Sequence, residues 1–330
     1  CNFTGTEQLC AKGRDPNSVL CGACLPGLTE TLSSSGVCND CEESNEWLVG
    51  FVLFAGFGAV YFFYFMGKRE RTIPHPFMTY CSKTLLFFYQ CLGFLTFRSK
   101  SQILRPLMEL ANLNWDVSED GTCLFRGINS RNKLWLNLLT PALLIIDMGL
   151  FYVYMKLNAK RVVKKMESEE EKKDWLEIEW IAFESAMWAM FLVVYVQITT
   201  SFIKLFLCWP FDNGWYMWYA GDVECFDAGH GICGFVAFVL VFLVPYAMLR
   251  GMKWYRDTHE NYDKVLASLI LSYKDECWYY SAFNIFRRAI LIVLPLVPFE
   301  DLSIRAAFIT FAVGLLLSVH CYLMPFKWSA

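Results

Sequence analysis

Charged residues are scarce in this chain of 330 residues, and positive charge is not in excess. Charged side chains make up 18% of the sequence, against about 25% in a typical soluble domain. The 29 Lys and Arg are balanced by 32 Asp and Glu, which argues against a nucleic-acid-binding protein. Hydrophobic residues reach 56%, which excludes a disordered protein and a secreted disulfide miniprotein. The remaining class is a multi-pass membrane protein.

The sequence also lacks the short motifs of common enzymes. It has no glycine-rich phosphate loop, no HExxH zinc motif, no G-x-S-x-G elbow and no kinase signature. The histidines are scattered and assemble neither a general acid–base pair nor a metal site. We therefore expect no enzyme, no cofactor and no bound metal. The histidines are His75, His230, His259 and His320.

The sequence does contain a series of long apolar runs with few charges. About 20 apolar residues, rising 1.5 Å each, cross the roughly 30 Å of bilayer hydrocarbon. The runs do not alternate at period two, so they predict helices and not a β-barrel. We expect an all-α polytopic membrane protein with seven transmembrane helices behind a small N-terminal disulfide-rich extracellular module. The helices are expected at about 47–66, 79–97, 134–155, 177–207, 231–249, 277–299 and 306–324.

The run 79–97 is the weakest of the seven because Lys83 lies near its start. The ammonium of Lys83 can reach the membrane surface from a spanning helix. A helix lying flat on the membrane is the alternative interpretation. On this organisation, residues 1–46 form the extracellular module and residues 47–330 form the transmembrane domain.

Lys and Arg are distributed unequally among the connections between these runs. Most fall in 67–78, 156–176, 250–276 and the C-terminal end, and none falls in 208–230. Because cytoplasmic loops carry the excess of Lys and Arg, we predict the N-terminus outside and the C-terminus inside. The basic connection 98–133 is an exception on the outer side. We expect the protein in a plasma or ciliary membrane.

Residues 1–46, which we call the head, contain six cysteines and few apolar residues, so cross-links must hold them together. Two C-x2-C pairs fit a four-thiolate zinc knuckle, and the same spacing fits an EGF-like or TNF-receptor-like disulfide module. The predicted outer location favours disulfides, and the glycosylation sequon at Asn2 agrees with it. The cysteines are Cys1, Cys10, Cys21, Cys24, Cys38 and Cys41.

A second group of cysteines is expected on the outer side, at Cys123, Cys208 and Cys225. A Cys208–Cys225 bridge would close the aromatic loop 208–230, whereas pairing Cys123 with either of them would join two helix pairs. The sequence leaves all three pairings open. His230 with Cys225 and Cys233 suggests a metal site, but we favour an ordinary histidine at a helix end.

Four charged residues lie deeper in the predicted spans than the charges near the span ends, and buried charges in a membrane usually have partners or a function. They are Asp147, Glu184, Arg287 and Arg288, all placed in the inner half of the bundle by helix geometry. We predict that they form one intramembrane charge network. A structural staple is the favoured interpretation, and a gating lock is the alternative.

Several short motifs follow one another in an order that resembles a known family. The chain is similar to the C-terminal seven-pass region, TRP-like or receptor-like, of large protist or algal surface proteins. In those proteins a long ectodomain ends in EGF-like cysteine modules. The motifs that carry the resemblance are Cys21–Gly27, Gly36–Cys41, Ser82–Leu85, Tyr89–Gln90, Phe206–Cys208, Trp278–Tyr280, Arg287–Arg288 and Met324–Lys327.

The resemblance implies a large extracellular region upstream, in keeping with a sequence that opens at Cys1. Our leading hypothesis is a non-enzymatic membrane anchor or receptor-like module that tethers a large extracellular assembly. The alternatives are a TRP-like cation channel subunit and a G-protein-coupled-receptor-like sensor. The expected partners are membrane lipids, an extracellular protein assembly and a second copy of the chain, but not nucleic acid.

Overall fold

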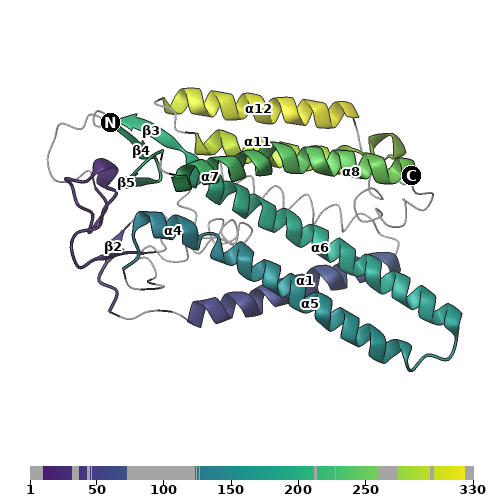
Figure 1. Ribbon diagram of the computed structural model, residues 1–330. Coiled ribbons are helices and arrows are strands. Elements are labelled where there is room, and N and C mark those ends of the chain that lie inside the picture. Colours follow the sequence, from purple (N-terminus) through teal and green to yellow (C-terminus); the bar gives the residue numbers. More distant parts are fainter. Residues whose placement is uncertain are drawn as a thin grey trace.

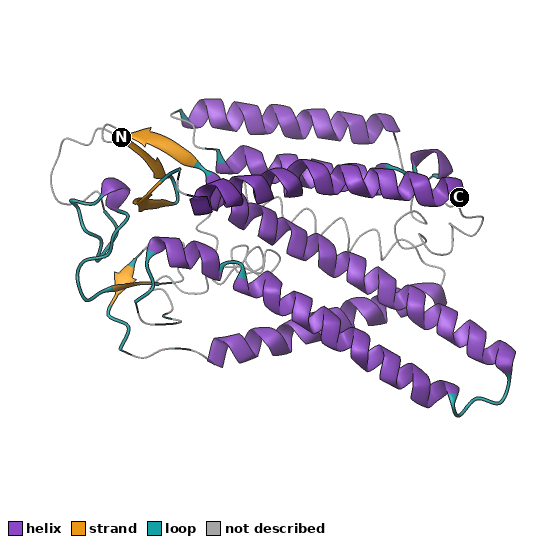
Figure 2. Cartoon of the chain, viewed as in Figure 1, coloured by secondary structure: helices purple, strands orange, loops and turns teal. Residues whose placement is uncertain are grey.

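The computed structural model describes residues 10–31, 37–42, 45, 47–72, 123, 125, 127–211, 214–226, 228–258, 274–297 and 301–323. Within these residues the chain is mainly helical and carries two small antiparallel sheets (Figure 2). Three predictions lie outside them: the span at 79–97, the glycosylation site at Asn2 and the role of Cys1.

The helices coincide with the apolar runs, and several of them continue into the charged sequence that flanks these runs. The described helices are α1 (Trp47–Thr72), α4 (Ser130–Leu136), α5 (Leu139–Val163), α6 (Glu169–Phe206), α7 (Ala228–Phe238), α8 (Val244–Thr258), α11 (Tyr280–Leu296) and α12 (Leu302–Leu323). The short helical turns are η1 (Val19–Cys21), η2 (Val239–Leu243) and η3 (Asp275–Cys277). The strands are β1 (Thr29–Glu30), β2 (Cys38–Asn39), β3 (Cys208–Phe211), β4 (Gly214–Met217) and β5 (Ala220–Glu224).

Five helical stretches are long and apolar enough to cross a membrane, so the chain is a helical membrane protein. The predicted span at 277–299 is occupied by α11, which has only 17 residues and carries Arg287 and Arg288, and it is not among the five. The described part of the chain therefore shows five of the seven predicted spans. The five are Val49–Met66, Arg131–Val163, Glu169–Phe206, Gly229–Thr258 and Ser303–Leu323.

The stretch that contains α7 and α8 is interrupted by the π-helical turn η2. In a π turn each N–H binds the carbonyl five residues earlier, and the N–H of Val244 does so with Val239. Pro245 has no N–H for the next carbonyl in this pattern, that of Leu240. The hydroxyl of Tyr195, on α6, donates to that carbonyl instead, at 2.9 Å. A side chain of a neighbouring helix thus donates the hydrogen bond that Pro245 cannot give to the carbonyl of Leu240.

Helix α6 is shared by two clusters of buried side chains. Its first half packs with α1 and α5 around Tyr64, Leu144 and Phe151. Its second half packs with η2 and α11 around Val241 and Ile285. In Figure 1, α6 accordingly runs between α1 and α5 on one side of the bundle and α7, α8, α11 and α12 on the other.

The two sheets and the head lie at the same end of the helices. Figure 1 shows η1, β2 and the sheet β3–β4–β5 together at one end, and the connection from α5 to α6 at the other. Residues of β5 and η1 are in contact. We call the end that carries η1, β2 and the sheet β3–β4–β5 the head end. This arrangement is the one expected if the head and the loop 208–230 face the same side of a membrane.

Candidate functional site

The head is organised by disulfide bonds. Cys10 pairs with Cys21 and Cys24 pairs with Cys38, with Cα–Cα distances of 5.6 and 5.8 Å. The third bridge joins Cys41 to Cys123. All four cysteines of the proposed zinc knuckle are therefore engaged in disulfides, so the zinc interpretation of the two C-x2-C pairs is wrong for this structure. A disulfide sulfur is not the thiolate that zinc requires.

Glycine and a short sheet bring these bridges together. Strands β1 and β2 are antiparallel, with Glu30 opposite Cys38. Gly13 has a φ of +79°, and a side chain there would collide with the carbonyl oxygen of Cys38. The backbone of the head therefore approaches β2 more closely than any other residue type allows.

A buried carboxylate forms the centre of the contact between the head and the membrane domain. Glu30 is 5% exposed and accepts hydrogen bonds from Arg14 Nη2 at 2.7 Å and from Lys133 Nζ at 3.2 Å. Arg14 also donates to the carbonyls of Cys21 and Gly22, at 3.3 and 2.6 Å. Arg14 belongs to the head and Lys133 to α4. One buried carboxylate therefore holds cations from both parts of the chain.

Backbone hydrogen bonds and the third disulfide add to this contact. The N–H of Glu30 donates to the carbonyl of Ile128 at 3.0 Å, and the N–H of Gly127 donates to Thr29 Oγ1 at 3.2 Å. The Cys41–Cys123 bridge connects positions 82 residues apart in the sequence. We call this set of contacts the junction. Its members are Arg14, Thr29, Glu30, Cys41, Cys123, Gly127, Ile128 and Lys133.

The sheet of β3, β4 and β5 covers the head end beside the junction. Cys208 and Cys225 form a disulfide across it, so the pairing that closes the loop 208–230 is the one present. The two pairings that joined Cys123 to Cys208 or Cys225 are wrong, because Cys123 is bound to Cys41. Strand register places Cys208 opposite Met217 and Tyr216 opposite Glu224.

Tyr219, in the turn between β4 and β5, fastens this sheet to the helices. Its hydroxyl donates to the carbonyl of Leu296, at the end of α11, at 3.0 Å. The ammonium of Lys204 lies 5.5 Å from the centre of its ring. Burial raises the pKa of Tyr219 to about 12, and the positive charge of Arg305 opposes this shift.

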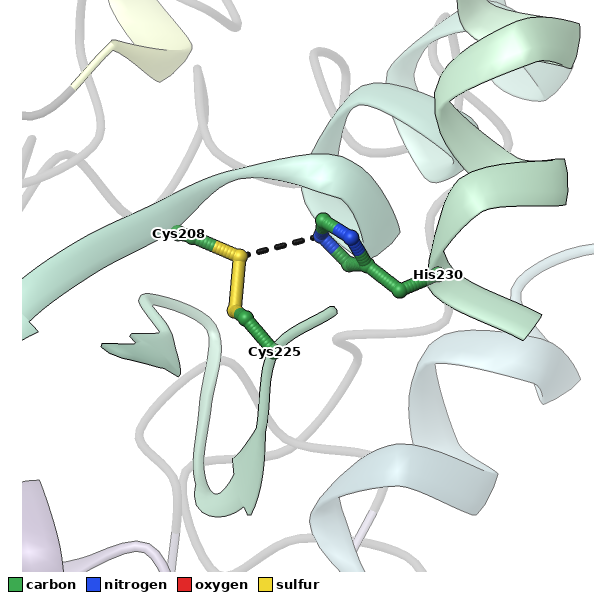
Figure 3. A group of neighbouring side chains, drawn as sticks. All are labelled: Cys208, Cys225 and His230. Carbon is green, nitrogen blue, oxygen red and sulfur yellow. Dashed lines mark hydrogen bonds between the residues drawn. A yellow bond between two sulfur atoms is a disulfide. The ribbon is translucent and has the colours of Figure 1, made fainter. Parts of the chain in front are cut away.

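His230 lies in the first turn of α7, against the Cys208–Cys225 bridge (Figure 3). Its Nε2 is 3.0 Å from Cys208 Sγ and 2.8 Å from the carbonyl oxygen of Phe206, and its ring stacks on that of Phe206. One ligand atom each of Cys208, Cys225 and His230 lies within 4.8 Å of the others. Both sulfurs are engaged in the disulfide, so this arrangement offers a metal only the imidazole.

The structure places Asp147 and Arg288, the two buried members of the predicted charge network, beside different neighbours. Asp147 lies on α5 in the region that packs on α1, and Arg288 lies on α11, close enough to Tyr195 for its charge to act there. Glu184 and Arg287 are half-buried on α6 and α11. Among the residues that the structure describes, no ion pair joins Asp147 to Arg287 or Arg288. Leu144 and Phe151, on the helix of Asp147, belong to one buried cluster, and Ile285 and Ala289, on the helix of Arg288, belong to the other.

An ion pair between a buried carboxylate and a partly exposed lysine, which the sequence did not predict, lies at the other end of the helices. Glu179 on α6 accepts from both Tyr64 and Lys68 on α1. Glu179 lies near the start of the predicted span 177–207 and was not among the four charges of the predicted network. Tyr64 and Lys68 are four residues apart on α1, on one helix face, and this spacing is the signal that could have indicated the pair.

Comparison of the chain with family models, with curated proteins and with solved structures finds no match. The junction, the sheet at the head end and the membrane helices are therefore the basis for any statement about function.

Proposed function

We propose that the chain is a non-enzymatic membrane anchor, or receptor-like module, that tethers a large extracellular assembly to a surface membrane through the head. The observation that carries this proposal is the junction. It ties the head to the membrane domain by a disulfide, Cys41–Cys123, and by a buried ion cluster around Glu30. A flexible tether needs neither feature.

The junction gives the head a second route to the bundle. One route is the peptide chain that continues into α1 at Trp47, and the other runs through Cys123 and Lys133 into α4 and α5. A pull on the head is then divided between two helices at positions distant in sequence. Two attachments also resist rotation of the head, which one flexible connection does not.

The proposal includes the orientation and the number of spans. The head and the sheet β3–β4–β5 are outside, the connection 164–168 is inside, and α11 together with residues 79–97 brings the number of spans to seven. The sorting of Lys and Arg supports this orientation. The common position of the head and the sheet at one end of the helices supports it as well (Figure 1).

Protease treatment of intact cells tests the orientation. We expect cleavage within residues 10–42 on intact cells, and cleavage within 164–168 only after permeabilisation. The reverse pattern would contradict the proposal.

Recording from planar phosphatidylcholine bilayers separates the anchor from the TRP-like channel. We expect the reconstituted chain to leave the current at the level of the lipid alone. Unitary cation currents from the wild-type chain would contradict the anchor and favour the channel.

A further inference from the structure

Asp147 is a carboxyl group buried in the middle of a membrane-spanning stretch. It lies within Arg131–Val163 and is 2% exposed, and its Oδ2 has no hydrogen-bond partner among the residues that the structure describes. Its neighbour across the helix contact is Gly56 of α1, where an added Cβ would collide with Oδ2. The absence of a side chain at Gly56 therefore makes the space that this oxygen occupies.

The surroundings of Asp147 are apolar. The Leu144 side chain meets the same position of α1, and Val60 and Phe151 lie in the adjoining buried cluster. A charge in such surroundings costs at least about 2.5–3.5 kcal/mol on insertion scales. A buried charge is retained when it is paired, and a buried carboxyl that lacks a partner becomes neutral by taking up a proton.

No titratable side chain that the structure describes on α1 or α6 is bonded to Oδ2 of Asp147. Lys68 and Tyr64 are bound to Glu179. Glu184, on α6, carries the same sign of charge as an ionised Asp147. Among the described side chains of α1, α5 and α6, the buried titratable groups besides Asp147 are Tyr64, Glu179 and Tyr195, and the half-buried ones are Lys68, Lys172, Glu177, Glu184 and Lys204.

We propose that Asp147 is a proton-binding site inside the membrane, formed where α5 crosses α1 at Gly56. The carboxylate takes up one proton to give the neutral acid, and its loss returns the carboxylate and one proton. The neutral form allows close contact of the two helices, and the ionised form opposes it. This proposal does not depend on the proposed anchor function, so a result that contradicts one proposal does not contradict the other.

Infrared difference spectroscopy of the chain in lipid nanodiscs tests the proposal. The wild type at neutral pH is expected to show the C=O stretching band of a protonated carboxylic acid, and Asp147→Asn is expected to lose that one band. Identical spectra of the two proteins in this region would overturn the proposal.

Two glycine variants keep the test decisive if Asp147→Asn does not fold. Gly56→Ala forces the Asp147 carboxyl to move and is expected to shift its band. Gly58→Ala lies two residues away on the same helix, where an added Cβ meets nothing within 4 Å, and is expected to leave the band unchanged. A band at the same position in the wild type and both glycine variants would contradict a protonated carboxyl at this contact.

Discussion

At the scale of single residues, Glu30 is the group on which the junction most depends. Its carboxylate is buried between two cations, one from the head and one from α4. Removing one member of a buried ionic cluster leaves the remaining charges buried without a partner. The resulting loss of folding free energy is larger than the net stabilisation that the cluster provides over apolar residues in its place.

Glu30→Gln is therefore expected to destabilise the head by about 3–5 kcal/mol. The measurement is hydrogen exchange of the backbone amides at 29–31 and 37–39, which should become faster. Glu169→Gln is the matched control, because Glu169 is 88% exposed and its ion pair with Lys172 lies on a helix surface. Equal exchange in the Glu30→Gln variant and the wild type would show that the cluster does not hold the head.

The charged residues also show what the sequence predicts well and what it does not. Composition and apolar runs predicted helices, a membrane location and a cross-linked head. The Glu30–Lys133 and Glu179–Lys68 ion pairs escaped prediction because their members are 103 and 111 residues apart in sequence. Residues so far apart are brought together only by the packing of whole helices, which no local pattern encodes.

At the scale of elements, the turn η2 depends on a hydroxyl from another helix. Tyr195 donates to Leu240, whose carbonyl lacks a donor because of Pro245. Tyr195→Phe leaves this carbonyl unsatisfied and is expected to cost about 1–3 kcal/mol. Thermal unfolding in nanodiscs measures the loss. Tyr246→Phe is the control, since Tyr246 is exposed on α8. Equal melting temperatures of the two variants would contradict this account of the turn.

The sheet at the head end should weaken in alkali because of Tyr219. Its pKa is about 12 in the folded chain, above the ordinary value of 10. Between these pH values the unfolded chain loses the phenolic proton and the folded chain keeps it, so stability is complete below pH 10 and falls as the pH rises toward 12.

Tyr219→Phe removes this contribution to the pH dependence. We expect its free energy of unfolding to fall less than that of the wild type between pH 9 and pH 11. At pH 9 the variant should be less stable by about 1 kcal/mol, because the hydrogen bond to Leu296 is lost. Parallel pH profiles of the two proteins would contradict the assignment to Tyr219.

The elements were predicted unevenly from the sequence. The start of α1 at Trp47 coincides with the predicted start of the first span. The π turn was not predicted, because proline in an apolar run is compatible with a kink, a helix end or a π turn alike. Disulfide pairing could not be chosen either. The Cys41–Cys123 bridge connects parts that the sequence analysis had treated as separate, the head and the connection before α4.

At the scale of the whole molecule, the Cys41–Cys123 bridge couples the head to the membrane domain. The double variant Cys41→Ala/Cys123→Ala is expected to increase hydrogen exchange both in residues 10–42 and in 127–133, while the membrane helices exchange as before. Cys321→Ala is the control, because Cys321 is an exposed free cysteine on α12. Unchanged exchange in the double variant would show that the noncovalent contacts alone maintain the coupling.

The most direct test of the anchor is to pull on the head while the protein sits in a supported bilayer. An optical trap holds a handle attached at the N-terminal end of the head. For the wild type we predict that the head stays docked until helices leave the membrane. For Cys41→Ala/Cys123→Ala we predict a separate, earlier step in which the head is released. An early release of the head from the wild-type chain would contradict the claim that the junction makes this protein an anchor.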